Sequence, residues 1–149
     1  MPRTNHDPDA ALLLDNQVCF ALYSASLAMT KLYKPLLDEL GLTYPQYLAM
    51  LVLWERDGLM VSELGERLSL DSGTLTPLLK RLEAAGLIAR MRAVEDERRV
   101  HIVLTAEGRK LKQKARKVPG CVLEASQCSI PELVDLTKRL REFRQRLVA

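Results

Sequence analysis

Cys19 is the residue of this chain whose type and neighbours could carry out chemistry. Tyr23 follows it by four residues, about one helical turn, and Tyr33 and Tyr44 follow it by 14 and 25 residues. Phenol O–H groups that donate to a sulfur stabilise the thiolate, which is the form of a cysteine that reacts with peroxides. The pattern therefore indicates a peroxide-reactive thiol. A single helical cysteine is more often a small buried hydrophobe, and that alternative stays open.

The length of the surrounding helix limits how these residues could meet. Apolar residues recur every three or four positions from Leu12 to about Leu40, which is typical of one long helix that Pro35 should kink or break. Fourteen residues at about 1.5 Å each put Tyr33 roughly 21 Å from Cys19. Contact therefore requires either a second copy of the chain or a sharp break in the helix.

Cys121 and Cys128 are the other thiols of the chain. They are seven residues apart, so they would share one face of an unbroken helix. An odd number of cysteines without C-x-x-C spacing or a signal peptide points to a reducing cytoplasm, where cysteines are buried, catalytic, metal-bound or redox-sensing. Cys128 directly precedes a predicted helix cap, Ser129, and could be held by that turn.

Charge is distributed unevenly along the chain, although the net charge is only +3. Residues 1–79 hold 5 basic and 10 acidic side chains, residues 80–117 hold 12 and 5, and residues 118–149 hold 5 and 4. A basic block favours a polyanionic partner, because Lys and Arg release counterions from phosphates. A solvated helix face would produce the same run of charge.

Periodicity predicts a mainly α chain with one small β-hairpin. Ser62, Asp71, Thr105 and Ser129 should each cap a helix, and His101 should face solvent on the hairpin. Two short helices followed at once by a hairpin form a winged helix-turn-helix. The expected helices are 12–40, 47–54, 62–68, 72–85, 105–118, 121–127 and a last one that opens at 129–132, and the expected strands are 87–92 and 99–104.

The second short helix and the hairpin tip carry the polar groups that a DNA-reading surface needs. An α-helix fits the major groove of B-DNA, and its exposed face must present hydroxyls and cations to phosphates and base edges. An arginine at the hairpin tip could enter the minor groove. Each of these residues alone fits a solvated helix face or a surface ion pair equally well. The predicted DNA contacts are Ser72, Thr74, Thr76, Lys80, Arg81 and Arg98, with Asp96 holding the Arg98 guanidinium.

The chain resembles the winged helix-turn-helix regulators of the MarR family over roughly residues 12–147. The resemblance is carried by the segments Val61–Leu68 and Asp71–Leu87 and by the D-x-R signature in Asp96–Arg99. The resemblance implies a homodimer in which 12–44 and 105–149 form a helical dimerisation layer and 45–104 forms the DNA-binding lobe. Long apolar-striped helices at both chain ends also favour a dimer, because one small lobe cannot bury them. A two-fold dimer would bind a palindromic double-stranded operator.

Two further segments, Leu14–Ser24 and Leu42–Tyr47, are similar to the organic-hydroperoxide-sensing OhrR type of that family. The resemblance implies that an organic hydroperoxide oxidises Cys19 and that oxidation releases the operator. It further implies that Tyr33 and Tyr44 hydrogen-bond to this sulfur across the dimer, and that an apolar pocket contains Tyr23 and Trp54.

The same resemblance implies a second thiol that closes an intersubunit disulfide with the oxidised cysteine. The two-cysteine members of the type place that thiol close to Cys121–Glu124, and Glu124 itself is not a cysteine, so this chain departs from the pattern in register. Cys121 is favoured over Cys128 as the resolving residue.

Other classes of protein find less support in the sequence. No apolar run approaches the ~20 residues that span a bilayer, so a cytoplasmic protein without a membrane partner is expected. His6 and His101 are far apart and suggest no metal site, and the absence of a glycine-rich phosphate loop or a hydrolase triad predicts no cofactor and no enzyme. Two alternatives remain: a MarR-type repressor released by a small aromatic ligand, with Cys19 structural, and a thiol peroxidase.

Overall fold

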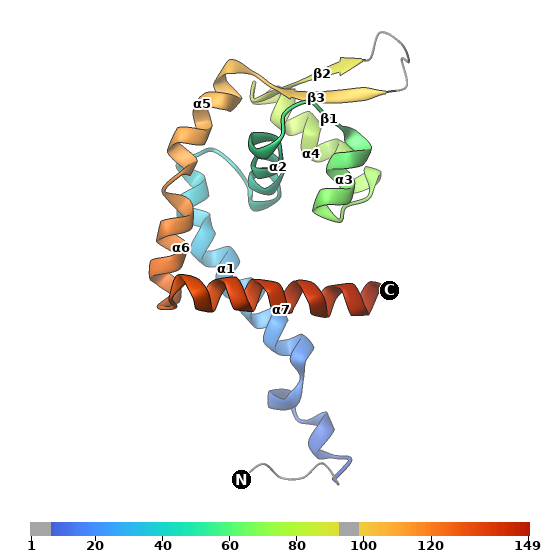
Figure 1. The fold of residues 1–149 in the computed structure, drawn as a ribbon, viewed down its shortest axis with the longest axis vertical. Coiled ribbons are helices and arrows are strands. Elements are labelled where there is room, and N and C mark those ends of the chain that lie inside the picture. The colour runs from blue at the N-terminus through green and yellow to red at the C-terminus, as the bar shows by residue number, and fades with distance from the viewer. Residues whose placement is uncertain (1–6, 93–98) are drawn as a thin grey trace.

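The computed structural model describes residues 7–92 and 99–149, which form a mainly helical chain with a small sheet, as the sequence predicts (Figure 1). Two short 3-10 segments come first, η1 (Ala10–Leu12) and η2 (Leu14–Asn16). The helices are α1 (Val18–Asp38), α2 (Tyr44–Glu55), α3 (Val61–Leu68), α4 (Ser72–Ala84), α5 (Ala106–Ala115), α6 (Val118–Ser126) and α7 (Ile130–Val148). The strands are β1 (Leu59–Met60), β2 (Ile88–Arg92) and β3 (Val100–Leu104).

Side-chain caps fix the starts of α2, α4, α5 and α7. Each capping oxygen accepts a hydrogen bond from the backbone N–H three residues on, which satisfies one donor that a helix N-terminus leaves open. The predicted cap at Ser62 is wrong, because α3 begins one residue earlier and Glu63 Oε1 accepts from Met60 N at 3.1 Å. The capping residues are Thr43 and the three others that the sequence predicts, Asp71, Thr105 and Ser129.

The first helix is shorter than predicted, because residues 10–16 form 3-10 turns. Asn16 Nδ2 donates to Ala10 O at 2.6 Å, and Gln17 Nε2 donates to Ala11 O at 2.6 Å. These side chains occupy carbonyls that a regular helix would bond through its own backbone. The α-helix therefore begins only at Val18.

Among the described residues, Pro35 and Pro77 lie beyond the first turn of a helix. Pro35 does not end α1, which continues to Asp38. Pro77 is the sixth residue of α4, deeper than the first-turn position that the sequence suggests. Its missing N–H leaves the carbonyl of Gly73 without a helical partner, and Gly73 is exposed to water that can take this bond.

The predicted hairpin pairs antiparallel, with Ile88 opposite Leu104 and Arg92 opposite Val100. A third strand, β1, pairs with the other edge of β3, so that the strand order is β1-β3-β2. Sequence periodicity could not reveal β1, because two residues are too few to show an alternation.

The turn before β1 is joined to β3 at two points. Asp57 Oδ1 accepts from Leu104 N at 2.8 Å, and His101 Nδ1 lies 3.1 Å from Gly58 O. His101 is half-buried by this contact. The expectation that it faces solvent is therefore wrong, because β1 covers the edge of β3 that an isolated hairpin would expose.

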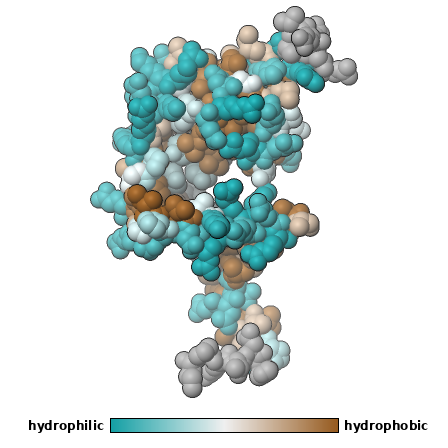
Figure 2. All heavy atoms as spheres, in the orientation of Figure 1, coloured by the Kyte–Doolittle hydropathy of each residue, from teal (hydrophilic) through white to brown (hydrophobic). Residues whose placement is uncertain are grey.

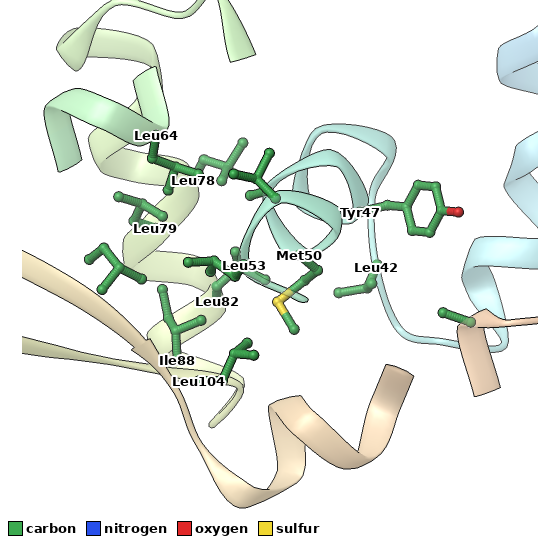
Figure 3. Packing of buried hydrophobic residues seen from close by; sticks show 14 of the residues in the cluster. Leu42, Tyr47, Met50, Leu53, Leu64, Leu78, Leu79, Leu82, Ile88 and Leu104 are labelled. Carbon is green, nitrogen blue, oxygen red and sulfur yellow. The ribbon is translucent and has the colours of Figure 1, made fainter. Parts of the chain in front are cut away.

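The hydrophobic core fills the space between α2, α3, α4 and the sheet (Figure 3). Burying each large aliphatic side chain there stabilises the folded state by about 1.5–3 kcal/mol. The apolar face predicted for the second short helix is confirmed as buried. It consists of Leu75, Leu78, Leu79 and Leu82, which pack with Met50, Leu53, Leu64 and Ile102.

The segment after the hairpin divides differently from the prediction. The helix that begins after Thr105 ends at Ala115, and α6 begins at Val118. Pro119 lies in the first turn of α6 and has no N–H to donate to the carbonyl of Ala115, where α5 ends. The predicted interruption is therefore present, although the break falls before Pro119 itself.

Large apolar side chains remain exposed on the N-terminal segment, α1 and α7 (Figure 2). Leu12 is 80% exposed and Leu147 is 69% exposed, and no residue of α7 is buried. These faces have no covering within one chain. Across the described residues, no helix has the length and apolar character needed to cross a membrane.

Candidate functional site

Cys19 and Tyr33 lie in the same unbroken helix, α1, with Cys19 in its first turn and Tyr33 near its end. The Cys19 side chain is exposed. At about 1.5 Å per residue the two are roughly 21 Å apart along the axis. A break in the helix between them, one of the two routes to contact, is therefore excluded, and the thiol and this phenol stay apart within one chain.

The two predicted pocket residues lie on different helices. Tyr23 follows Cys19 by one turn of α1 and is 62% exposed. Trp54 lies near the end of α2, where its indole Nε1 donates to Gly108 O at 2.9 Å. Trp54 lines a cavity between α2 and α5 that does not include Tyr23. The structure therefore does not unite this pair in one pocket of a single chain.

Tyr33 and Tyr44 do come together, and a third tyrosine joins them. The Tyr33 and Tyr44 ring centroids are 5.0 Å apart, and Tyr47 lies 5.9 Å from Tyr33 and 6.5 Å from Tyr44. These are distances at which tilted aromatic pairs attract one another. We call Tyr33, Tyr44 and Tyr47 the tyrosine cluster.

The start of α2 holds the cluster in place. Thr43 N donates to Gln46 Oε1 at 2.9 Å, and Gln46 N donates back to Thr43 Oγ1 at 3.4 Å. This reciprocal cap, followed by Pro45, fixes Tyr44 as the first residue of the helix. Tyr47 follows three residues later in α2, so its side chain lies on the same side of the helix as Tyr44.

Burial extends the protonated form of the Tyr33 phenol to higher pH. Desolvation, with the neighbouring Tyr44 and Tyr47, raises the pKa of Tyr33 from 10.0 to about 12. Burial and Tyr44 also raise the pKa of Tyr47. At neutral pH both phenols are protonated, as an ordinary tyrosine is, and their hydroxyls can donate to an anion.

Cys121 and Cys128 occupy different local structures. Cys121 lies in the body of α6 and is half-buried, whereas Cys128 follows the end of that helix, with its Sγ 3.4 Å from Ser126 O. The expectation that the two share one helical face is wrong, because α6 ends at Ser126. One turn before Cys121, Lys117 forms an exposed ion pair with Glu39, which follows α1.

Helices α3 and α4 form the predicted helix-turn-helix. Gly65 permits their close approach, because a Cβ there would lie 2.9 Å from Leu70 O, the carbonyl of the turn. Asp71 Oδ1 accepts from Thr74 N at 2.8 Å, and this bond holds the pKa of the Asp71 carboxyl below its usual range. The predicted contacts lie off the buried face of α4: Thr76 is half-buried, and Ser72, Thr74, Lys80 and Arg81 are exposed.

The hairpin extends the cationic surface from α4. Arg92 is exposed at the end of β2, and Arg90 Nε lies 3.9 Å from Glu83 Oε2 on α4. The predicted tip residues Asp96 and Arg98 lie outside the described residues. The basic block of residues 80–117 is therefore shared between α4, the hairpin and α5 (Figure 1).

Comparison with known proteins identifies the family. The model of the transcriptional regulator SarA/Rot family matches residues 31–115. The organic hydroperoxide resistance transcriptional regulator of Bacillus subtilis is 57% identical over 127 residues, which cover 85% of this chain and 86% of the relative. The chain is a winged-helix transcriptional regulator of the MarR/SarA type.

Solved structures of AbfR from Staphylococcus epidermidis share the fold of this regulator. One is 33% identical, covers 94% of this chain and 97% of AbfR, and has a TM-score of 0.77. Reduced AbfR bound to DNA is 34% identical over 91% and 95% of the two chains, with a TM-score of 0.70. Disulfide-formed AbfR is 35% identical over the same shares, with a TM-score of 0.62.

Sequence reasoning missed Tyr47. Its position in an apolar helical run predicts a core residue, and it is indeed only 3% exposed. Figure 3 shows the ring at the edge of the core with its hydroxyl pointing away from the leucines. The i, i+3 spacing of Tyr44 and Tyr47 was the available signal, because residues so spaced share one face of a helix.

Proposed function

We propose that this regulator is a peroxide-responsive repressor. It would act in the cytoplasm as a homodimer that binds DNA while its cysteines are reduced. The observation that carries the proposal is that Cys19 lies in the first turn of α1, whereas Tyr33, the α1 member of the tyrosine cluster, lies near the other end of this unbroken helix. A thiol and the phenols that could stabilise it then meet only between two copies. The 57% identity to a regulator of organic hydroperoxide resistance supports this assignment.

The exposed apolar faces supply the surface for such a dimer. Most of the large exposed apolar side chains belong to residues 12–29 and to α7. Contiguous apolar surface of this kind marks an interface. We assign residues 12–44 and 105–149 to the dimerisation layer and 45–104 to the DNA-binding lobe. Two lobes related by a two-fold axis would bind a palindromic operator.

In the reduced dimer, α4 would lie in the major groove. Ser72, Thr74 and Thr76 would face phosphates and base edges, with Lys80 and Arg81 toward the backbone. Arg98 at the hairpin tip, held by Asp96, would enter the minor groove. The structure of a relative, reduced AbfR bound to DNA, supports this arrangement.

The first chemical step is oxidation of Cys19 by an organic hydroperoxide. The thiolate attacks the distal peroxide oxygen, so that an S–O bond forms as the O–O bond breaks. Sulfur loses two electrons to the peroxide, which leaves as an alkoxide and takes up a proton to become the alcohol. The partner's Tyr33 and Tyr44 would donate to the thiolate beforehand, because phenols keep their protons at neutral pH.

The second step closes a disulfide. The Cys121 thiolate of the other copy attacks the sulfenic sulfur, the S–S bond forms, and the oxygen leaves as hydroxide, which is protonated to water. A disulfide requires Cα atoms about 4.4–6.8 Å apart. Because Cys121 lies in α6 and Cys19 in α1, drawing the two together would move these helices and change the spacing of the lobes. We favour Cys121 over Cys128, which is held by Ser126.

Cys19→Ser tests the proposal. The reduced variant should bind an operator fragment with wild-type affinity, and cumene hydroperoxide should leave it bound while it releases the wild type. Release of the variant by the peroxide would overturn the proposal. An aromatic carboxylate that releases both proteins would favour a ligand-controlled repressor, and many turnovers of peroxide per cysteine would favour a thiol peroxidase.

A further inference from the structure

Asp57, in the turn between α2 and β1, is bonded to the last residue of β3. Its Oδ1 accepts from Gly58 N and from Leu104 N, both at 2.8 Å. Strands β1 and β3 pair antiparallel, with Leu59 opposite Ile102. Continuing that register by two residues places Asp57 opposite Leu104, so the carboxylate accepts from an N–H that a longer β1 could have bonded through its backbone. The Asp57 side chain therefore extends the hydrogen bonding of this strand pair to the end of β3.

Two further contacts hold the same corner of the hairpin. His101 Nδ1 lies 3.1 Å from Gly58 O, which keeps the turn against β3. Arg109 Nη1, from the first turn of α5, donates to Leu104 O at 3.0 Å. The N–H of Leu104 is thus held by Asp57 and its C=O by Arg109, and Leu104 itself is buried. These bonds fix the base of the hairpin relative to α2 and α5.

A small rotation at Leu104 would be amplified along the hairpin. A strand rises about 3.3 Å per residue, so Val100, at the other end of β3, lies about 13 Å from Leu104. Arg92 pairs with Val100 and is exposed. A rotation of about 10° at Leu104 would therefore move the Arg92 end of the hairpin by about 2 Å. Such a displacement is enough to break a hydrogen bond to a phosphate.

The charge of Asp57 does not account for its contribution. Its Oδ2 lies 4.0 Å from Arg109 Nη1, and the two side chains are 41% and 60% exposed, so this ion pair adds little. In a DNA-binding lobe a carboxylate repels phosphates, and its removal should by itself tighten binding. What Asp57 supplies is an acceptor oxygen. Without it the N–H of the buried Leu104 would lose its partner, which is costly.

We infer that Asp57 is a positioning residue for DNA binding, which acts through Leu104 to fix the base of the hairpin and so the place of Arg92 on the operator. The acceptor oxygen of Asp57, and not its charge, carries this role. The inference rests on the proposed function in one respect, because it requires the hairpin to contact DNA. It does not depend on the oxidation of Cys19.

Two substitutions at Asp57 separate the acceptor from the charge. The probe is a DNA duplex selected from a random library with the reduced wild type, and binding is measured by fluorescence anisotropy in the presence of a reductant. Asp57→Ala should bind about tenfold more weakly, because Leu104 N–H loses its partner. Asp57→Asn, which keeps the acceptor oxygen, should bind at least as tightly as the wild type. Thermal unfolding checks that the variants are folded.

A double-mutant cycle shows whether Asp57 acts through the hairpin. Arg92→Gln should weaken binding by itself, and Asp57→Ala should then cost clearly less than tenfold, because the cation that Asp57 positions is gone. In Lys80→Gln, which removes a cation of α4, Asp57→Ala should still cost about tenfold. A general loss of folded protein would weaken binding equally in both backgrounds. The difference between the two backgrounds therefore reports positioning and not stability.

Three results would overturn the inference: wild-type affinity in Asp57→Ala, Asp57→Asn as weak as Asp57→Ala, or an equal cost of Asp57→Ala in the two backgrounds. If Asp57→Ala does not fold, Asp57→Ser takes its place, because its oxygen is one bond closer to the backbone and falls short of Leu104 N. Wild-type affinity in Arg92→Gln would refute the contact of the hairpin with DNA in the proposed function, and the inference with it. Peroxide sensing through Cys19 would stand in each case.

Discussion

The Tyr33 and Tyr44 rings lie 5.0 Å apart although they come from two helices, and both are far from the Cys19 of their own chain. If the pair stabilises a thiolate, as proposed, that thiolate must belong to a second copy of the chain. This relationship makes the subunit origin of each group in the site testable.

Mixed dimers should reveal which subunit supplies the phenols. In a Tyr33→Phe/Tyr44→Phe homodimer, Cys19 should react with organic hydroperoxide about tenfold or more slowly, because the thiolate loses charge-assisted hydrogen bonds. In a mixed dimer of that chain with Cys19→Ser, the remaining Cys19 faces intact tyrosines and should recover the wild-type rate. Rates of sulfenic acid formation, measured with a trapping reagent, distinguish the cases. A mixed dimer as slow as the double-Phe homodimer would mean that the tyrosines act within their own chain or not at all.

The Tyr33 pKa should appear in the stability of the protein at high pH. The unfolded chain loses this phenol proton near 10, whereas the folded chain keeps it to about 12. The contribution is therefore fully present below pH 10 and is lost as the pH rises toward 12. Urea unfolding midpoints between these values should fall less steeply in Tyr33→Phe than in the wild type. Tyr23→Phe, at an exposed position outside the cluster, should behave as the wild type, and identical curves for all three proteins would contradict the assignment.

Local signals explain which parts of the fold the sequence could predict. The caps at Asp71, Thr105 and Ser129 act on N–H groups three residues away, so the starts of α4, α5 and α7 are readable without tertiary information. The start of α1 was not readable in the same way. It depends on Asn16 and Gln17 reaching back six residues to backbone carbonyls, which periodicity does not register.

The candidate site depends more strongly on contacts between distant residues. Spacing alone showed that Cys19 and Tyr33 could not meet in a straight helix, and the unbroken α1 leaves that argument intact. The role of Tyr47 was hidden because a buried tyrosine in an apolar run looks like core until its neighbours in space are known. The cavity beside it draws on α2 and α5, whose residues are some 60 positions apart, and no sequence window contains both.

The resolving thiol can be assigned on a non-reducing gel. After treatment with organic hydroperoxide, the wild type and Cys128→Ser should show a disulfide-linked dimer band. Cys121→Ser should lack it, because Cys128 is held by Ser126 outside α6. Mass spectrometry of the band should identify the Cys19–Cys121 linkage. A band that persists in Cys121→Ser and disappears in Cys128→Ser would reverse the assignment.

The base of the hairpin depends on a glycine in α5. A Cβ at Gly108 would lie 2.1 Å from Leu87 O, a carbonyl that already accepts from Thr105 N at 3.1 Å. Gly108 O in turn accepts from the Trp54 indole. Gly108→Ala should therefore push α5 away from the hairpin and lower the free energy of unfolding by about 1–3 kcal/mol.

Gly120→Ala is the matched control, because Gly120 lies inside α6 with nothing within 4 Å of an added Cβ. Alanine has the higher helix propensity, so this variant should gain up to about 1 kcal/mol. Chemical unfolding of both variants gives the comparison, and operator binding shows whether the shift at Gly108 reaches the hairpin. Equal stability of the two variants would mean that α5 can move away from Leu87 without loss of stability. The close packing of α5 against the hairpin would then not constrain the position of the lobe.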